Sequence, residues 1–251
     1  MSADPFEAFF AALEARHRRE LELTEIRKGV QALSSLYVHR RGRLDRLRAG
    51  AGKRAAFALY YGALHFLVVR QIVRAIEGPR PRRILDLGCG TGAAGAAWAL
   101  ESGAAYEGIE RSGWAAEEGR WTLRALGVEG RIVRRDLAGV PLPGEQAGIL
   151  LAFTANELAE GERTALLHRL LSANARGAFV LVVEPLSRRI AGSWWDAWRA
   201  AFVAAGGRAD EWRFALDLPP TLALLDRAAG LDHRNLTARS LWVDDSMVSA
   251  A

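Results

Sequence analysis

The chain has 251 residues, half of them hydrophobic, with 34 Arg and Lys against 29 Asp and Glu and a formal net charge of +5, which suits one α/β domain with an appendage. Its only cysteine, Cys89, excludes disulfides within the chain and thiolate metal clusters, and its five histidines show no paired ligand spacing, so we expect no metal. No apolar run reaches the ~18 residues that a membrane span requires, and the acidic start is unlike a secretory signal, so we expect a cytoplasmic protein.

Residues 1–80 are predicted to form a helical extension. Asp4 can cap a first helix, and apolar residues then recur at helical spacing. Gly50-Ala51-Gly52 predicts a break between helices, and Pro79-Arg80-Pro81 interrupts the helical pattern just before the first strand. We therefore expect a second domain over residues 81–251.

Positive charge is concentrated in this extension. Residues 1–82 carry 16 Arg or Lys against 8 Asp or Glu, a formal +8, whereas residues 83–251 carry 18 against 21, a formal −3. The densest cluster consists of Arg40, Arg41, Arg43, Arg46 and Arg48. Arginine forks suit phosphate groups, so the cluster suggests contact with RNA. A solvated helix face in an arginine-rich chain is the alternative.

A short apolar strand that begins at Arg83 then runs into a glycine-rich loop and an alanine-rich helix. The loop positions are Asp86, Gly88, Cys89, Gly90, Thr91 and Gly92. Alternating glycines before a helix N-terminus are typical of a nucleotide-cofactor loop, because the backbone must approach the ligand closely. An acid at the strand end can accept from the ammonium of a zwitterionic ligand and would repel phosphate. The pattern therefore favours S-adenosylmethionine (SAM) over a dinucleotide.

Two further acids follow predicted strands. Glu110 ends the second strand roughly 20 residues after the loop, the register of a ribose-binding carboxylate. Asp136 follows the third strand, Arg131–Arg134, and either faces the ligand or caps its own loop.

The remaining pattern predicts more strands and helices in alternation. Two nearly continuous apolar runs indicate strands buried on both faces, and the later segments indicate a closing hairpin. The predicted elements are a strand over 148–153, a helix over 160–175, a strand over 178–183, a strand over 211–216, a helix over 220–229 and a strand over 236–243.

The stretch from Leu85 to Gly92 resembles the first motif of class I SAM-dependent methyltransferases. The resemblance implies an α/β fold with a doubly wound, Rossmann-like, seven-stranded sheet, and it implies an enzyme that transfers the methyl group of SAM. It also implies that Asp136 and the Leu137 backbone face the adenine, and that the loop after the fourth strand, beginning at Phe153, points toward the sulfonium. The cofactor-binding residues expected in this way are Asp86, Gly88, Cys89, Gly90, Thr91, Gly92, Glu110, Asp136, Leu137 and Phe153.

Candidate catalytic residues follow the fourth and fifth strands. Asn156 can orient a substrate donor and Glu157 can accept a proton, while Glu184 is a further candidate at the end of the fifth strand. Each has a structural alternative: helix capping by Asn156 or Thr154, and a hydrogen bond from Glu184 to the neighbouring loop.

A narrower resemblance connects these positions. A helical N-terminal region, Asn156-Glu157-Leu158 after strand four and Val183-Glu184-Pro185 after strand five are similar to the Rsm22-like ribosomal small-subunit methyltransferase family, although the additional cysteines of that family are missing. The resemblance implies ribosomal or other structured RNA as the acceptor and a part in rRNA processing.

Two alternatives to an RNA methyltransferase remain open. One is a small-molecule or peptide methyltransferase whose acceptor lies under an apolar lid of Tyr60, Tyr61, His65 and the Trp194-Trp195-Trp198 cluster. The other is a SAM-binding ribosome assembly factor that transfers no methyl group.

Overall fold

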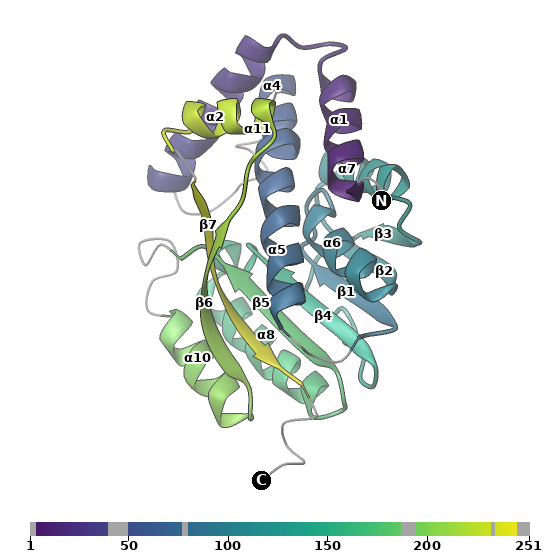
Figure 1. The fold of residues 1–251 in the computed structure, drawn as a ribbon. Helices are drawn as coiled ribbons and strands as arrows, with labels where there is room; N and C mark the ends of the chain where they lie inside the picture. The colour runs from purple at the N-terminus through teal and green to yellow at the C-terminus, as the bar shows by residue number, and fades with distance from the viewer. Residues whose placement is uncertain (1–3, 40–49, 77–79, 187–193, 232–233, 245–251) are drawn as a thin grey trace.

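A computed structural model describes residues 4–39, 50–76, 80–186, 194–231 and 234–244 (Figure 1). The arginine cluster predicted to contact RNA, which comprises Arg40, Arg41, Arg43, Arg46 and Arg48, lies outside the described residues.

Seven strands in the described part of the chain form one sheet in the order β3-β2-β1-β4-β5-β7-β6. The first five strands are parallel, while β7 runs antiparallel to both β5 and β6. The predicted seven-stranded sheet with an antiparallel end hairpin is therefore confirmed. The strands are β1 (Arg83–Leu87), β2 (Ala105–Glu110), β3 (Gly130–Arg134), β4 (Ala147–Ala152), β5 (Phe179–Glu184), β6 (Arg208–Ala215) and β7 (Asn235–Val243).

Helices cover both faces of this sheet. Figure 1 shows α8 and α10 behind the sheet, with α5 and α6 in front of it. The alternation of side chains along each strand separates two apolar cores, so that Leu150 of β4 packs with the front helices, whereas Ile149 and Leu151 pack with α8 and α10. The helices that cover the sheet are α5 (Ala63–Ala75), α6 (Ala93–Ser102), α7 (Gly113–Leu126), α8 (Glu160–Asn174) and α10 (Trp194–Ala204).

A group of helices gathers at one end of the molecule, at the top of Figure 1, and is called the helical cap here. It combines the predicted N-terminal extension with a helix from near the C-terminus, because α11 packs against both α2 and η1. The cap consists of α1 (Pro5–His17), α2 (Leu23–His39), α4 (Ala51–Ala56), the π-helical segment η1 (Phe57–Gly62) and α11 (Pro220–Ala228). The predicted helix break lies at Gly50, whereas Ala51 and Gly52 belong to α4.

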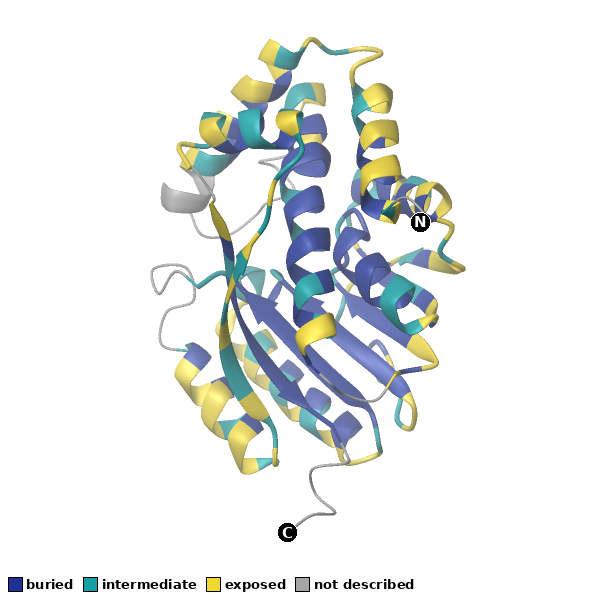
Figure 2. Cartoon of the chain, viewed as in Figure 1, coloured by how far each residue is buried: buried dark blue, intermediate teal, exposed yellow. Residues whose placement is uncertain are grey.

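One helix runs without interruption from Ala51 to Ala75 through α4, η1 and α5. The expectation that no apolar stretch reaches the length of a membrane span is wrong for this segment, since its 25 residues are long and apolar enough. However, 78% of its most apolar window is buried inside the protein, and Figure 2 shows the helix dark blue along most of its length. We therefore interpret it as a core helix.

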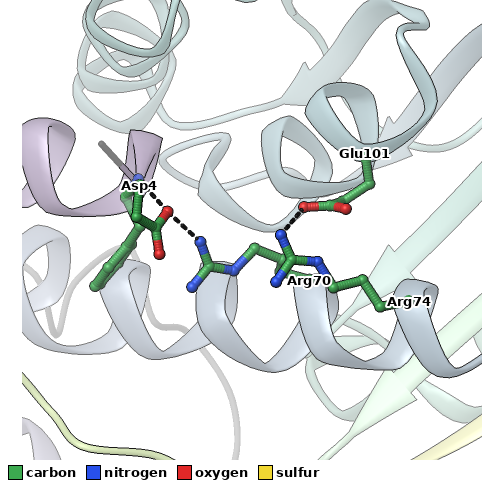
Figure 3. A network of polar contacts seen from close by, with 5 residues as sticks. Asp4, Arg70, Arg74 and Glu101 are labelled. Carbon is green, nitrogen blue, oxygen red and sulfur yellow. Dashed lines mark hydrogen bonds and ion pairs between the residues drawn. The ribbon is translucent and has the colours of Figure 1, made fainter. Parts of the chain in front are cut away.

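Helix α1 is fixed by apolar and polar contacts. Its apolar face is buried, with Phe6 stacked on Phe66 at 5.3 Å. Asp4 caps the helix as predicted, since it accepts from the Phe6 backbone N–H at 3.0 Å, and the same oxygen lies 2.6 Å from the Arg70 guanidinium of α5. Figure 3 shows this pair beside the ion pair between Arg74 and Glu101, which joins α5 to α6.

Candidate functional site

The glycine-rich loop between β1 and α6 has the backbone that its sequence predicts. Gly88, Gly90 and Gly92 all have positive φ angles, of 70°, 55° and 73°, a region that residues with a Cβ rarely occupy. Space is also restricted, since a Cβ on Gly88 would lie 2.4 Å from Cγ2 of Thr154. The loop can therefore lie directly against the segment that follows β4.

Asp86 is buried beneath this loop, with 1% of its surface exposed. The Tyr106 hydroxyl donates to Oδ2 of Asp86 at 2.9 Å. Burial raises the pKa of Asp86 to about 7, against the opposing effect of hydrogen bonds from Tyr106 and the Gly95 backbone. A carboxyl group in this state is poised to lose its proton when a cation arrives beside it.

Glu110 ends β2 and connects the second strand to the loop. Its carboxylate accepts from the Gly90 N–H at 2.9 Å and from the Ser112 N–H at 2.7 Å. Only 7% of its surface is exposed. The loop conformation and the position of this carboxylate therefore depend on each other.

A cavity of about 450 Å³ opens beside the loop, at the carboxyl ends of β1, β2 and β4. This volume lies within the range typical of small-molecule and cofactor sites. Nine of the ten predicted cofactor residues border it, namely Asp86, Gly88, Cys89, Gly90, Thr91, Glu110, Asp136, Leu137 and Phe153. Gly92 does not border it, because it lies at the N-cap of α6 and faces Ile132. That these residues bind SAM stays a prediction.

The loop after β3 is held in place from α8. The Asp136 carboxylate accepts from the Ala138 N–H at 2.9 Å, so Asp136 shapes its own loop while it borders the cavity. Arg169 of α8 donates to the backbone carbonyls of Leu137 and Val140. The sequence gives no motif that marks Arg169, which reaches this loop only through the fold.

The segment after β4 is conformationally constrained. Phe153 has a φ of 56°, which is unusual for a residue with a bulky side chain. The Thr154 hydroxyl lies within hydrogen-bond distance of the Gly88 and Ala152 carbonyls, at 3.1 Å and 3.0 Å. Thr154 lies at the N-cap position of the 3-10 helix η2 (Ala155–Glu157), but capping by its side chain is wrong, because the hydroxyl bonds to the glycine loop and to the strand end.

Glu184 organises the rest of this segment. It is fully buried, and its two carboxylate oxygens accept from the Ala155 N–H at 2.9 Å and from the Asn156 side-chain amide. The Trp194 indole N–H donates to Oδ1 of Asn156 at 3.1 Å. Asn156 therefore caps no helix, contrary to that expectation. It joins Glu184 to α10.

Of the three candidate catalytic residues, Glu157 alone borders the cavity. Asn156 and Glu184 lie behind it, so they can position the loop but do not line the space that a ligand would enter. Burial raises the pKa of Glu184 to about 8, against the hydrogen bonds from Ala155 and Asn156 and the nearby charge of Arg239.

Segment η1 of the helical cap and the start of α5 supply another part of the cavity wall, called the cap wall. Phe57, Gly62 and His65 border the cavity, and the His65 ring is stacked on the Phe153 ring with centroids 3.9 Å apart and planes 10° apart. Gly62 lies against the cofactor loop, since a Cβ there would be 2.9 Å from Oγ1 of Thr91.

The expected apolar lid is wrong in most of its members. Among the described residues that border the cavity, His65 is present but Tyr60, Tyr61 and the three tryptophans are not. The buried Tyr60 hydroxyl instead donates to Asp226 of α11 at 2.8 Å. Trp195 and Trp198 are buried in the core between α10 and the sheet.

No protein-family model matches the chain, and no curated protein sequence matches it significantly. Solved structures are similar in fold. The mitomycin 7-O-methyltransferase MmcR gives a TM-score of 0.53 at 17% identity, over 96% of this chain and 73% of its own. A Nostoc punctiforme protein described as a candidate O-methyltransferase gives 0.52 at 18% identity, over 76% of this chain, and the match spans only 59% of that protein.

The methyltransferase domain of bacterial CtHen1-C gives a TM-score of 0.50 at 14% identity, over 72% of this chain and 98% of that domain. None of these similarities shows the narrower Rsm22-like resemblance. The strand order, the glycine loop and these similarities together assign the chain to the class I fold of SAM-dependent methyltransferases.

Proposed function

We propose that this protein is a SAM-dependent methyltransferase. The observation that carries the proposal is the joint position of Asp86 and Glu110, which border one cavity beside a loop of three positive-φ glycines. Two carboxylates suit a ligand with an ammonium group and a ribose diol, and they would repel a pyrophosphate.

The residues of this chain then have separate tasks. Asp86 accepts from the ammonium group, Glu110 accepts from the ribose hydroxyls, and the loop at Asp136 and Leu137 faces the adenine. When bound, SAM supplies a methyl group that is already activated for transfer, so the protein mainly has to align the acceptor with it. Little acid–base machinery is required unless the acceptor must lose a proton.

The acceptor that we propose is a small molecule, because η1 of the helical cap and the start of α5 border the cavity on one side and restrict access to it. Structured or ribosomal RNA is the second candidate, favoured by the +8 charge of residues 1–82 and the arginine cluster at 40–48. A SAM-binding assembly factor without turnover is the third.

Binding of SAM to variants tests the cofactor assignment. We expect Asp86→Ala and Glu110→Ala each to abolish SAM binding measured by titration calorimetry, because each removes a buried ionic partner of the ligand. Asp196→Ala is the matched control, since Asp196 is exposed on α10, away from the cavity. Folded Asp86 or Glu110 variants with wild-type affinity would refute the assignment.

Labelled methyl transfer distinguishes the three candidate functions. Radiolabelled SAM is added with the protein to an extract from a strain that lacks it, split into RNase-treated and untreated halves. Label that survives RNase and stays soluble in acid supports the small molecule, RNase-resistant label in the acid precipitate indicates a protein acceptor, and RNase-sensitive label establishes RNA. Replacement of Arg40, Arg41, Arg43, Arg46 and Arg48 by Gln should then flatten the salt dependence of RNA binding. Tight SAM binding with no transfer to either half supports the assembly factor.

A further inference from the structure

We propose that the cap side of the cavity is an acceptor subsite for a small hydroxylated aromatic molecule, and that His65 accepts the proton that the hydroxyl loses. The inference rests on the proposed methyltransferase function and specifies its substrate class. It also assigns a catalytic task to a residue outside the glycine loop and the strand ends.

The division of the cavity supports this assignment. The predicted cofactor positions lie on the glycine loop and on the segments that follow β2, β3 and β4. Phe57, Gly62 and His65 come instead from the helix that crosses the cap, and they meet the cofactor loop at Gly62. The cap wall is thus adjacent to the cofactor positions but distinct from them, as an acceptor wall must be.

The π-helical segment explains why these three residues share one wall. In an α-helix, residues five apart point about 140° away from each other around the axis. The i→i+5 bonding of η1 turns Phe57 and Gly62 toward the same side, and His65 follows on the next turn. Single π-turns of this kind are frequent at functional sites. The segment presents an aromatic ring, a gap without a side chain and an imidazole in succession.

The rings on this wall favour a flat aromatic acceptor. His65 and Phe153 form a parallel stacked pair, and Phe57 is itself supported by Tyr61 at 5.9 Å and by the edge of Trp114 at 6.2 Å. Rigid aromatic walls bind planar apolar ligands by stacking and edge contacts. The supporting rings keep Phe57 in place, so the wall is largely preformed.

His65 suits the proton transfer that a phenol requires. A neutral imidazole accepts protons near physiological pH, and stacking on Phe153 fixes the plane of the ring. The acceptor oxygen forms a bond to the methyl carbon, while the bond between that carbon and sulfur breaks and leaves S-adenosylhomocysteine. The hydroxyl proton passes to an imidazole nitrogen of His65 and then to solvent, and the product is a methyl ether.

The acidity of the acceptor provides the test. Methyl transfer from labelled SAM is measured with 4-methylphenol, which is un-ionised at slightly alkaline pH, and with 4-nitrophenol, which is largely ionised there. We expect His65→Gln to lower kcat about 100-fold or more with 4-methylphenol, as for loss of a general base, and far less with 4-nitrophenol. His168→Gln, an exposed histidine on α8, is the matched control and should behave as wild type with both phenols.

Other outcomes overturn the proposal. An equal loss of kcat with both phenols would show that His65 lines the cavity but accepts no proton. Loss of SAM affinity in the His65 variant would show that the cap wall binds the cofactor. The same acidity dependence in Glu157→Gln but not in His65→Gln would move the base to Glu157. If wild-type protein binds SAM but methylates neither phenol, the substrate class is wrong. If it does not bind SAM, the proposed function fails instead.

Discussion

Glu184 and Asn156 illustrate, at the scale of single residues, how two short motifs combine only in the folded chain. They lie 28 residues apart and meet because β4 and β5 are neighbours in the sheet. Their contact fixes the segment that carries Phe153 and Glu157 into the cavity wall. We therefore regard Glu184 as a positioning residue.

Glu184→Ala should destabilise the protein by about 1–3 kcal/mol, because it leaves the Ala155 N–H and the Asn156 amide without their buried acceptor. Urea unfolding measures this change. The control is Glu211→Ala, an exposed position of β6 that pairs with the same Arg239 in the sheet, and it should shift stability by no more than about 0.5 kcal/mol. Equal stability of the two variants would contradict the role given to Glu184.

Site residues that belong to one local sequence pattern could be predicted, whereas residues that only the fold brings together could not. Asp86, Glu110 and the loop glycines could be predicted because one local motif and one strand register contain them. Phe57 and Arg169 could not, because a π-turn and a helix packed across the sheet bring them to the cavity. For Asn156 the local sequence predicts either a substrate-orienting residue or a helix cap, whereas its partners are Glu184 and Trp194.

At the scale of elements, α1 is joined to the sheet-covering helices through a buried carboxylate. Glu118 of α7 is 3% exposed and pairs with His17 at 2.9 Å and with Arg16 at 3.2 Å. Burial opposes ionisation of Glu118, yet these two partners keep its pKa below the ordinary value. The stabilisation from Glu118 is therefore present above about pH 4.5 and is lost as pH falls further.

Glu118→Ala should lower the free energy of unfolding by about 2 kcal/mol, since it removes a charged acceptor shared by two side chains. Chemical denaturation at neutral pH measures the loss, and hydrogen exchange should show faster exchange in α1. Glu117→Ala, at the exposed neighbouring position of the same helix, should leave both unchanged. Full protection of α1 in the Glu118 variant would show that its apolar face alone holds the helix.

Most elements could be predicted because local signals agree with the tertiary structure. Gly103 and Gly127 end α6 and α7 with positive φ, as a glycine directly after a helical segment commonly does. The register of η1 could not be predicted, because propensity does not distinguish a π-turn from an α-turn. The burial of the helix Ala51–Ala75 could not be predicted either, because distant parts of the chain pack over it.

At the scale of the whole molecule, two buried carboxyl groups make stability depend on pH. Burial raises the pKa of Asp86 from 3.8 to about 7 and that of Glu184 from 4.5 to about 8. The folded protein therefore binds these protons more tightly than the unfolded chain. The stabilisation from both groups is fully present below about pH 4 and is lost as pH rises through 7 to 8.

The urea midpoint of wild-type protein should consequently fall between about pH 5 and about pH 8, and Asp86→Asn should flatten this dependence. SAM at saturating concentration should also flatten it, because an ammonium group beside Asp86 lowers the pKa of that carboxyl. Asp196→Asn serves as the control with an unaltered slope. A wild-type slope in Asp86→Asn would show that Asp86 does not bind the extra proton.

The hydrogen bond between Tyr60 and Asp226 joins residues that are 166 positions apart, and this separation has a consequence for synthesis on the ribosome. At translation rates of about 5–20 residues per second, α11 follows η1 by on the order of ten seconds. Throughout that interval the nascent chain presents Ala51–Ala75, a segment with the length and hydropathy of a membrane span, without its final cover. The Ala51–Ala75 helix therefore completes its packing only after α11 has been synthesised.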